Sequence, residues 1–119
     1  MSKLIANIIY KFTALVLLIL IISGCGISKY RNISCDDLSS KDATVQAIAI
    51  KWAGDNKVND ALGPLINILE YEDAALRFYA QQAIEKITDQ DMGYCYSDPP
   101  EKRIEAVQRW RQYLKQKNG

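Results

Sequence analysis

Residues 42–46 read Asp-Ala-Thr-Val-Gln, and residues 73–77 read Asp-Ala-Ala-Leu-Arg. The two stretches lie 31 residues apart, and the same offset places Ala49 on Ala80. In each stretch an Asp, which can accept hydrogen bonds from the first backbone N–H groups of a helix, precedes apolar residues spaced by three and four. A repeat of about 30–45 residues built from paired helices is typical of an α-solenoid. We therefore expect an all-α fold.

The other residues between 41 and 119 also predict helices. The first helix should end in the turn residues Gly54-Asp55-Asn56, and Asn59 can cap a second helix that carries Pro64 near its first turn. Asp73 then caps a third helix, and residues 88–100 form a loop.

The last helix should begin at the end of this loop. We expect Asp98 to cap it, with Pro99 at its first position and Glu101 completing a capping box. No apolar and polar residues alternate with a period of two over a useful length, so no strand is predicted. About four helices follow the N-terminal segment.

The second helix and its successor carry a family pattern. A Leu- and Ile-rich stretch with an early Pro, residues 64–69, leads to a turn with Asp73, then to Leu76-Arg77 and the packing positions 80–84. This pattern resembles HEAT repeats of the short bacterial type. The resemblance covers residues 41–115 and implies a short HEAT-like α-solenoid, an α-α superhelix.

Three departures qualify the resemblance. The first unit has no clear leading helix, and Gln46 stands where the second unit has Arg77. The chain also holds fewer than the three or so repeats that a stable stack usually needs. The final helix, which carries Trp110, should therefore close the core. A generic four-helix domain is the alternative.

The N-terminus predicts export. Lys3 and Lys11 precede the apolar run 12–22, and the small residues Ser23 and Gly24 follow it, as in a signal peptide. Cys25 comes directly after them, and this end resembles the lipobox of bacterial lipoproteins.

The lipobox resemblance implies cleavage between Gly24 and Cys25, a diacylglycerol thioether on the Cys25 sulfur and a third acyl chain, such as palmitate, on its amine. Residues 1–24 would then be the signal peptide, 25–40 a tether and 41–119 the helical domain. By the rule known for enteric lipoproteins, Gly26 implies the outer membrane, facing the periplasm, if the source has one.

Two alternatives to lipidation remain open. An uncleaved anchor would need about 20 mostly apolar residues, and Lys11 interrupts any window longer than residues 12–22. The other alternative is an ordinary secretory signal that happens to precede a Cys.

Composition excludes several functions. The 15 basic and 14 acidic residues are near balance, which argues against nucleic-acid binding. Basic residues are concentrated at 101–119, where they suit either an anionic partner or a solvated helix. The chain has no His and no phosphate-binding or dinucleotide motif, so we expect neither an enzyme nor a cofactor or metal.

A few residues are candidates for other roles. Cys35 and Cys95 can form a disulfide in an exported protein, or remain free thiols. Arg77 should bond to acidic groups or to a neighbouring turn, or else contact a partner. Tyr94 and Tyr96 either anchor their loop on the domain or contact a partner.

These observations predict a lipid-anchored, non-catalytic protein-interaction module with an envelope protein as its partner. A structural or inhibitor-like envelope protein is an alternative. A third is a ligand-binding protein similar to the phycobilin lyases, which share HEAT-like repeats, although this chain shows no catalytic constellation.

Overall fold

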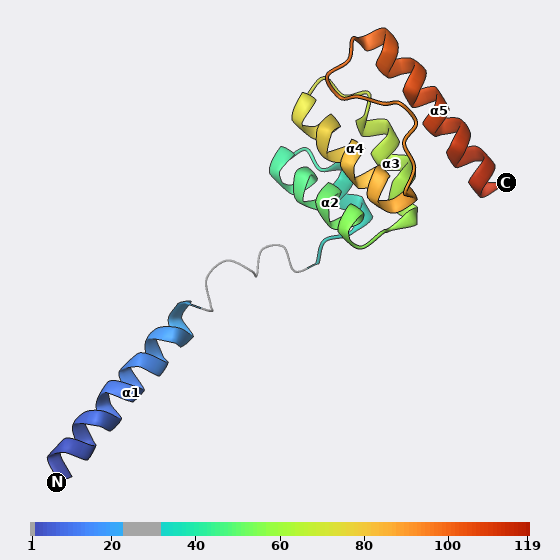
Figure 1. The fold of residues 1–119 in the computed structure, drawn as a ribbon. Helices are drawn as coiled ribbons and strands as arrows, with labels where there is room; N and C mark the ends of the chain where they lie inside the picture. The colour runs from blue at the N-terminus through green and yellow to red at the C-terminus, as the bar shows by residue number, and fades with distance from the viewer. Residues whose placement is uncertain (1, 23–31) are drawn as a thin grey trace. The chain divides into compact units, whose positions relative to one another are not determined.

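The secondary structure is entirely helical in residues 2–22 and 32–119, the parts of the chain that a computed structural model describes (Figure 1). This confirms the predicted all-α fold. The chain divides into two compact units, residues 1–32 and residues 33–119. The elements in chain order are α1 (Ser2–Ile22), η2 (Cys35–Ser39), α2 (Ala43–Asp55), η3 (Asn59–Ala61), α3 (Leu62–Ile68), α4 (Ala74–Thr88) and α5 (Pro100–Asn118).

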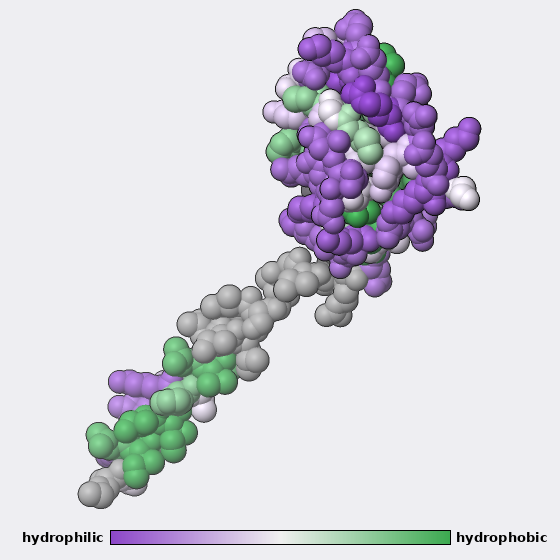
Figure 2. Space-filling model, turned by 45° about the vertical axis from the view of Figure 1, so that its right-hand side comes forward, coloured by the Kyte–Doolittle hydropathy of each residue, from purple (hydrophilic) through white to green (hydrophobic). Residues whose placement is uncertain are grey.

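The first unit holds α1. Its side chains are described for residues 2–17, and all of them are exposed, including large apolar ones such as Leu4, Ile8 and Phe12. Figure 2 shows how apolar residues dominate this helix, whereas the visible face of the second unit is mainly hydrophilic. Within the described parts of the chain, no helix combines the length and apolar character that crossing a membrane requires.

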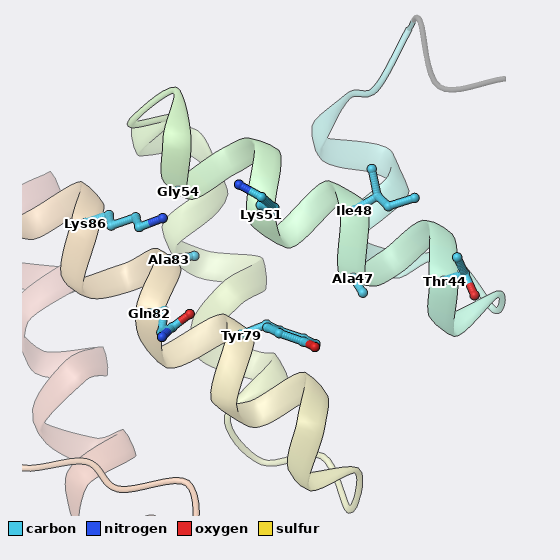
Figure 3. A pocket seen from close by; sticks show the side chains of 9 residues that line it. All are labelled: Thr44, Ala47, Ile48, Lys51, Gly54, Tyr79, Gln82, Ala83 and Lys86. Carbon is cyan, nitrogen blue, oxygen red and sulfur yellow. The ribbon is translucent and has the colours of Figure 1, made fainter. Parts of the chain in front are cut away.

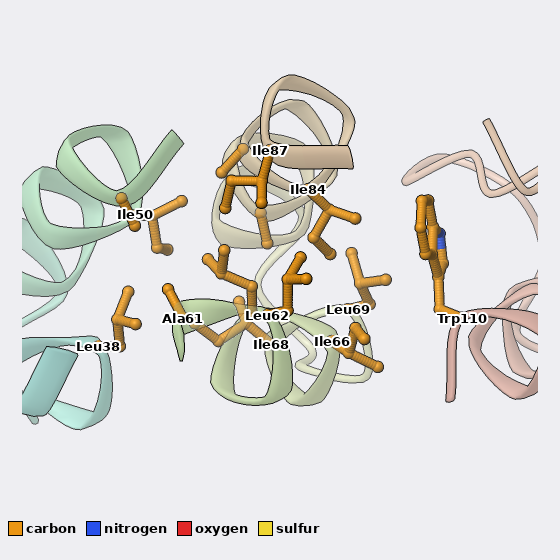
Figure 4. Packing of buried hydrophobic residues seen from close by; sticks show 14 of the residues in the cluster. Leu38, Ile50, Ala61, Leu62, Ile66, Ile68, Leu69, Ile84, Ile87 and Trp110 are labelled. Atoms are coloured by element: carbon orange, nitrogen blue, oxygen red, sulfur yellow. The ribbon is translucent and has the colours of Figure 1, made fainter. Parts of the chain in front are cut away.

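The second unit is built on contacts between neighbouring helices. α2 packs along α4, α3 packs against α4 and α5, and η2 packs against α2, α3 and η3. Apolar side chains from all these elements meet in one core (Figure 4). Leu38 from η2, Ile50 from α2 and Leu62 from α3 are almost completely buried, and Trp110 from α5 closes the core at the other end, as predicted. The core residues lie at 38–110, all within the compact unit of residues 33–119.

Two aspartates cap equivalent helices, as predicted. The Asp42 carboxylate accepts hydrogen bonds from the backbone N–H groups of Thr44, at 2.9 Å, and Val45, at 3.4 Å. The Asp73 carboxylate does the same at the start of α4, with distances of 2.9 and 3.2 Å. Both helices therefore begin with the same local structure.

The predicted cap at Asn59 was wrong. Residues 59–61 form the short η3, and α3 begins only at Leu62, with Pro64 in its first turn. The Asn59 side chain instead accepts a hydrogen bond from Lys117 Nζ at 2.7 Å. This side chain serves to hold the end of α5, not to start a helix.

The predicted start of the last helix was also wrong. α5 begins at Pro100, and Pro99 occupies the capping position without any side-chain cap from Asp98. A proline disfavours helical backbone at the residue before it, and Pro99 is extended, with φ −55° and ψ 152°. Pro100 therefore sets the boundary one residue later than the capping pattern predicted.

The segment expected to be a tether is partly folded. Residues 33–40 belong to the second unit, and η2 is closed by a hydrogen bond of 2.9 Å from the Ser34 N–H to the Asp37 carboxylate. Leu38 is only 1% exposed. The same offset of 31 residues aligns Leu38 with Leu69, which follows α3 and is also buried. In this alignment, η2 stands before α2 where the end of α3 stands before α4.

Candidate functional site

The predicted lipidation and cleavage residues, Gly24 and Cys25, lie outside the described residues. The remaining candidates lie in the second unit. Cys35 and Cys95 are both free thiols, so no disulfide joins them. η2, which carries Cys35, packs against α2, α3 and η3, whereas the Cys95 sulfur lies 3.2 Å from the Ser97 hydroxyl in the loop that leads to α5.

Arg77 is a buried structural residue rather than a partner contact. It is 8% exposed and donates hydrogen bonds to the carbonyl oxygens of Tyr71, at 2.7 Å, and Glu72, at 2.6 Å. Two more of its N–H groups reach the Tyr96 carbonyl oxygen at 3.0 and 3.2 Å. The prediction that Arg77 bonds to a neighbouring turn is confirmed, and the alternative of a partner contact was wrong.

Tyr94 anchors its loop on the core. It is 4% exposed, and its hydroxyl donates a hydrogen bond of 2.7 Å to the Leu69 carbonyl oxygen. Burial raises the pKa of this hydroxyl above its usual value of 10.0. Of the two alternatives for Tyr94, the structure shows the loop anchor, because its polar end is used within the fold.

Tyr96 is partly exposed and covers α4. Its ring lies 5.0 Å from that of Phe78 in an edge-to-face arrangement, and its N–H donates to the Gln81 side chain at 3.1 Å. These contacts anchor the loop, yet the neighbouring rings of Phe78 and Tyr79 remain 36% and 44% exposed. We call Phe78, Tyr79 and Tyr96 the aromatic ridge.

The aspartates of the α4–α5 loop serve local structure. Asp89 ends α4 with φ 53°, and the Asp91 carboxylate accepts a hydrogen bond of 2.7 Å from the Gly93 N–H. Within the described residues, no three side chains of the types that bind metals come together as a metal site would require. Asp89 is thus a helix C-cap and Asp91 a turn residue.

The basic residues of α5 mainly hold that helix in place. Arg103 and Arg109 each donate to a loop carbonyl oxygen, that of Asp98 at 3.0 Å and that of Met92 at 2.8 Å. Arg111 forms an ion pair of 2.5 Å with Glu70, which lies in the turn after α3. Much of the positive charge concentrated near the C-terminus is therefore explained by docking within the fold.

A groove lies between α2 and α4 in the second unit (Figure 3). Its volume is about 410 Å³. The lining residues are Thr44, Ala47, Ile48, Lys51 and Gly54 from α2 and Tyr79, Gln82, Ala83 and Lys86 from α4. We call this feature the α2–α4 groove.

Small residues shape the α2–α4 groove. A Cβ atom on Gly54 would lie 2.9 Å from the Ala83 Cα atom, closer than real Cβ atoms approach, so only glycine lets the helices come this near. Figure 3 shows Ala47 farther along α2, with the ring of Tyr79 pointing toward it from α4, whereas the side chain of the neighbouring Ile48 is directed away from Tyr79. The apolar floor is thus open along the middle of the groove.

Two lysines meet one aspartate at the Gly54 end. Asp55 accepts a hydrogen bond from Lys51 Nζ at 2.5 Å and another from Lys86 Nζ at 2.8 Å. The bonds to Lys51 and Lys86 lower the pKa of Asp55 to about 2. Sequence reasoning missed this cluster, although the repeat offset of 31 residues that aligns Asp42 with Asp73 also aligns Asp55 with Lys86.

Comparisons with protein-family models, with curated proteins and with solved structures found no match for this chain. What defines the second unit is therefore its own geometry: the helical pairs η2–α2 and α3–α4, an exposed aromatic ridge and a groove with a basic end. This arrangement offers surfaces for binding.

Proposed function

We propose that this protein is a bacterial lipoprotein, held on a membrane of the cell envelope by acyl chains on Cys25. Its folded unit would act as a non-catalytic protein-interaction module. The exposed apolar side chains of α1 carry the first part of the proposal.

A helix with apolar side chains on every face is unfavourable in water. Leu4, Ile8 and Phe12 are 53–69% exposed, and none belongs to the core of residues 38–110. A signal peptide accounts for such a helix, since it works in a membrane and is then removed. The Ser-Gly-Cys sequence at 23–25 follows where such a cleavage site belongs.

Replacing the proposed lipidated residue tests the anchor. Cells expressing the wild type, Cys25→Ser or Cys35→Ser would be labelled with radioactive palmitate and fractionated. We expect the wild type and Cys35→Ser to be labelled and to sediment with membranes, and Cys25→Ser to carry no label. Labelling of Cys25→Ser at the wild-type level would disprove the anchor.

The aromatic ridge supports the second part. Aromatic residues are enriched in the central parts of protein interfaces because they bury much area with few rotatable bonds. The rings of Phe78 and Tyr79 lie 5.7 Å apart and are partly open to solvent, and Tyr96 supports them from one side. The ridge is therefore the surface that we expect a protein partner to cover.

A photo-crosslinking side chain at position 78 tests this surface in living cells. The matched control carries the same group at Gln112, an exposed residue of α5. We expect an adduct of defined mass from position 78 that is missing from position 112. The same adducts from both positions, or no adduct from position 78, would count against an interaction through the ridge.

A further inference from the structure

The α2–α4 groove has an apolar middle and a positively charged end. Ala47 and Ile48 line the middle, and the Lys51 and Lys86 ammonium groups converge beside Gly54 (Figure 3). The groove runs along α2 from Thr44 to Gly54. At a helical rise of 1.5 Å per residue, this length is about 15 Å. The groove is therefore elongated along α2, with charge concentrated at one end.

The charge at this end favours an anion. Each lysine ammonium has three N–H donors and gives one of them to Asp55. Asp55 stays ionised at neutral pH, because its pKa is about 2, so the two lysines and the aspartate together carry one net positive charge. The Lys51 and Lys86 side chains are 70% and 51% exposed, which leaves their other donors accessible to a ligand.

The size of the groove favours a small molecule over a protein. Small-molecule sites have volumes of about 300–1,000 Å³, a range that includes the 410 Å³ found here. A stable protein interface instead engages about 20–30 residues on each side, whereas nine residues line this groove.

We propose that the α2–α4 groove binds a fatty acid as its carboxylate. The acyl chain lies over Ala47 and Ile48, beside the ring of Tyr79, and the carboxylate accepts hydrogen bonds from Lys51 and Lys86. Asp55 holds the two ammonium groups together at this position. This site is separate from the aromatic ridge except for Tyr79, and it does not depend on the proposed function.

Titration with dodecanoate, below the concentration at which it forms micelles, tests the proposal. The protein is the ¹⁵N-labelled fragment 33–119, the compact unit that contains the core residues 38–110. We expect saturable chemical-shift changes concentrated at residues 44–54 and 79–86. Dodecyltrimethylammonium, with the same chain and the opposite charge, should bind at least tenfold more weakly. Equal binding of this cation, or shifts spread evenly over the surface, would overturn the proposal.

Two double variants separate the charge from general electrostatics. Lys51→Met with Lys86→Met keeps the apolar stems and removes both charges, and Lys102→Met with Lys115→Met removes two exposed charges from α5. Since one exposed ion pair changes affinity by about two- to fivefold, the groove variant should bind dodecanoate about tenfold more weakly. The α5 variant should bind like the wild type, and equal losses in both variants would contradict the site.

A third variant tests the apolar middle. Ala47→Phe fills the groove without changing any charge, and it should abolish the localised shifts while the melting temperature shows that the unit remains folded.

Vesicles of an anionic phospholipid test whether the ligand is a membrane surface instead of a free fatty acid. If they shift residues 44–54 and dodecanoate does not, the groove recognises a membrane surface and the fatty-acid site is disproved.

Discussion

The first repeat, residues 35–55, and the second repeat, residues 62–88, perform the same structural task with different polar residues. Each has a helix capped by Asp and a buried polar side chain four positions later, Gln46 or Arg77. Gln46 donates one hydrogen bond, of 2.7 Å, to the Leu38 carbonyl oxygen. Arg77 donates four, to three different carbonyl oxygens.

The two buried side chains differ in the segments that they connect. In the first region, the segment before the capped helix is the short η2, and the Gln46 amide bonds to one carbonyl oxygen at its end. In the second repeat α3 is longer, and the α4–α5 loop adds a further carbonyl on the other side of the buried residue. Arginine has five N–H donors in a fixed plane, which lets one side chain connect both segments.

Replacing Arg77 and Gln46 in turn should give the largest difference in the free energy of unfolding between the two regions. Arg77→Met leaves three carbonyl oxygens without their donor, so we expect the free energy of unfolding to fall by about 3 kcal/mol. Gln46→Leu removes one bond and should cost about 1 kcal/mol. Urea denaturation of fragment 33–119 measures both, and equal losses would show that the two residues are equivalent after all.

The contact between the two repeats should give the next largest effect. Gly54→Ala forces a Cβ atom against Ala83, so α2 and α4 must separate, at a cost of about 2 kcal/mol. Gly63→Ala, in α3, is the matched control, since its nearest neighbour, a Leu114 methyl carbon, would lie at an ordinary 3.8 Å. We expect this control to be neutral or slightly stabilising. Similar thermal unfolding of both variants would contradict the close packing at Gly54.

The two caps should give matching effects. Asp42→Ala and Asp73→Ala each remove a carboxylate that accepts two backbone hydrogen bonds, so each should lower the free energy of unfolding by about 1 kcal/mol. If the losses of unfolding free energy in the two variants differ by more than twofold, the two caps are not equivalent.

The ion pair between Asp55 of α2 and Lys86 of α4 should give the smallest effect on stability, and this effect should appear only at low pH. The pKa of Asp55 is lowered from 3.8 to about 2 in the folded protein, so its contribution is complete above pH 3.8 and is lost as the pH falls toward 2. Asp55→Asn should therefore weaken the pH dependence of the melting temperature in this window. Asp60→Asn, which changes an exposed residue of η3, is the control and should follow the wild type there.

Sequence patterns predicted the features that depend on nearby residues. The Asp42 and Asp73 caps, the end of the first helix and the burial of Trp110 all followed from spacing and residue type. The start of α5 did not, because two consecutive prolines offered two similar positions and the capping pattern favoured the wrong one. The five-residue η2 is too short to show a helical period, so it was assigned to the tether.

The candidate site was harder to predict because it depends on contacts between segments. Arg77 was recognised as a residue that bonds to a turn, but its bond to the Tyr96 carbonyl spans 19 residues and has no local signal. The burial of Tyr94 against Leu69 is likewise a long-range contact. For the Asp55 and Lys86 pair, the repeat offset did contain the information, since opposite charges align on neighbouring helices.

The four hydrogen bonds of Arg77 also bear on the order in which the chain folds. Its bonds to Tyr71 and Glu72 span six and five residues, so they can form as soon as α4 does. Its bonds to Tyr96 need a segment that leaves the ribosome later. We therefore expect a nascent chain that ends after α4 to hold α2, α3 and α4 together only loosely. Protection against hydrogen exchange should rise when residues 94–96 are added, and again when α5 closes the core.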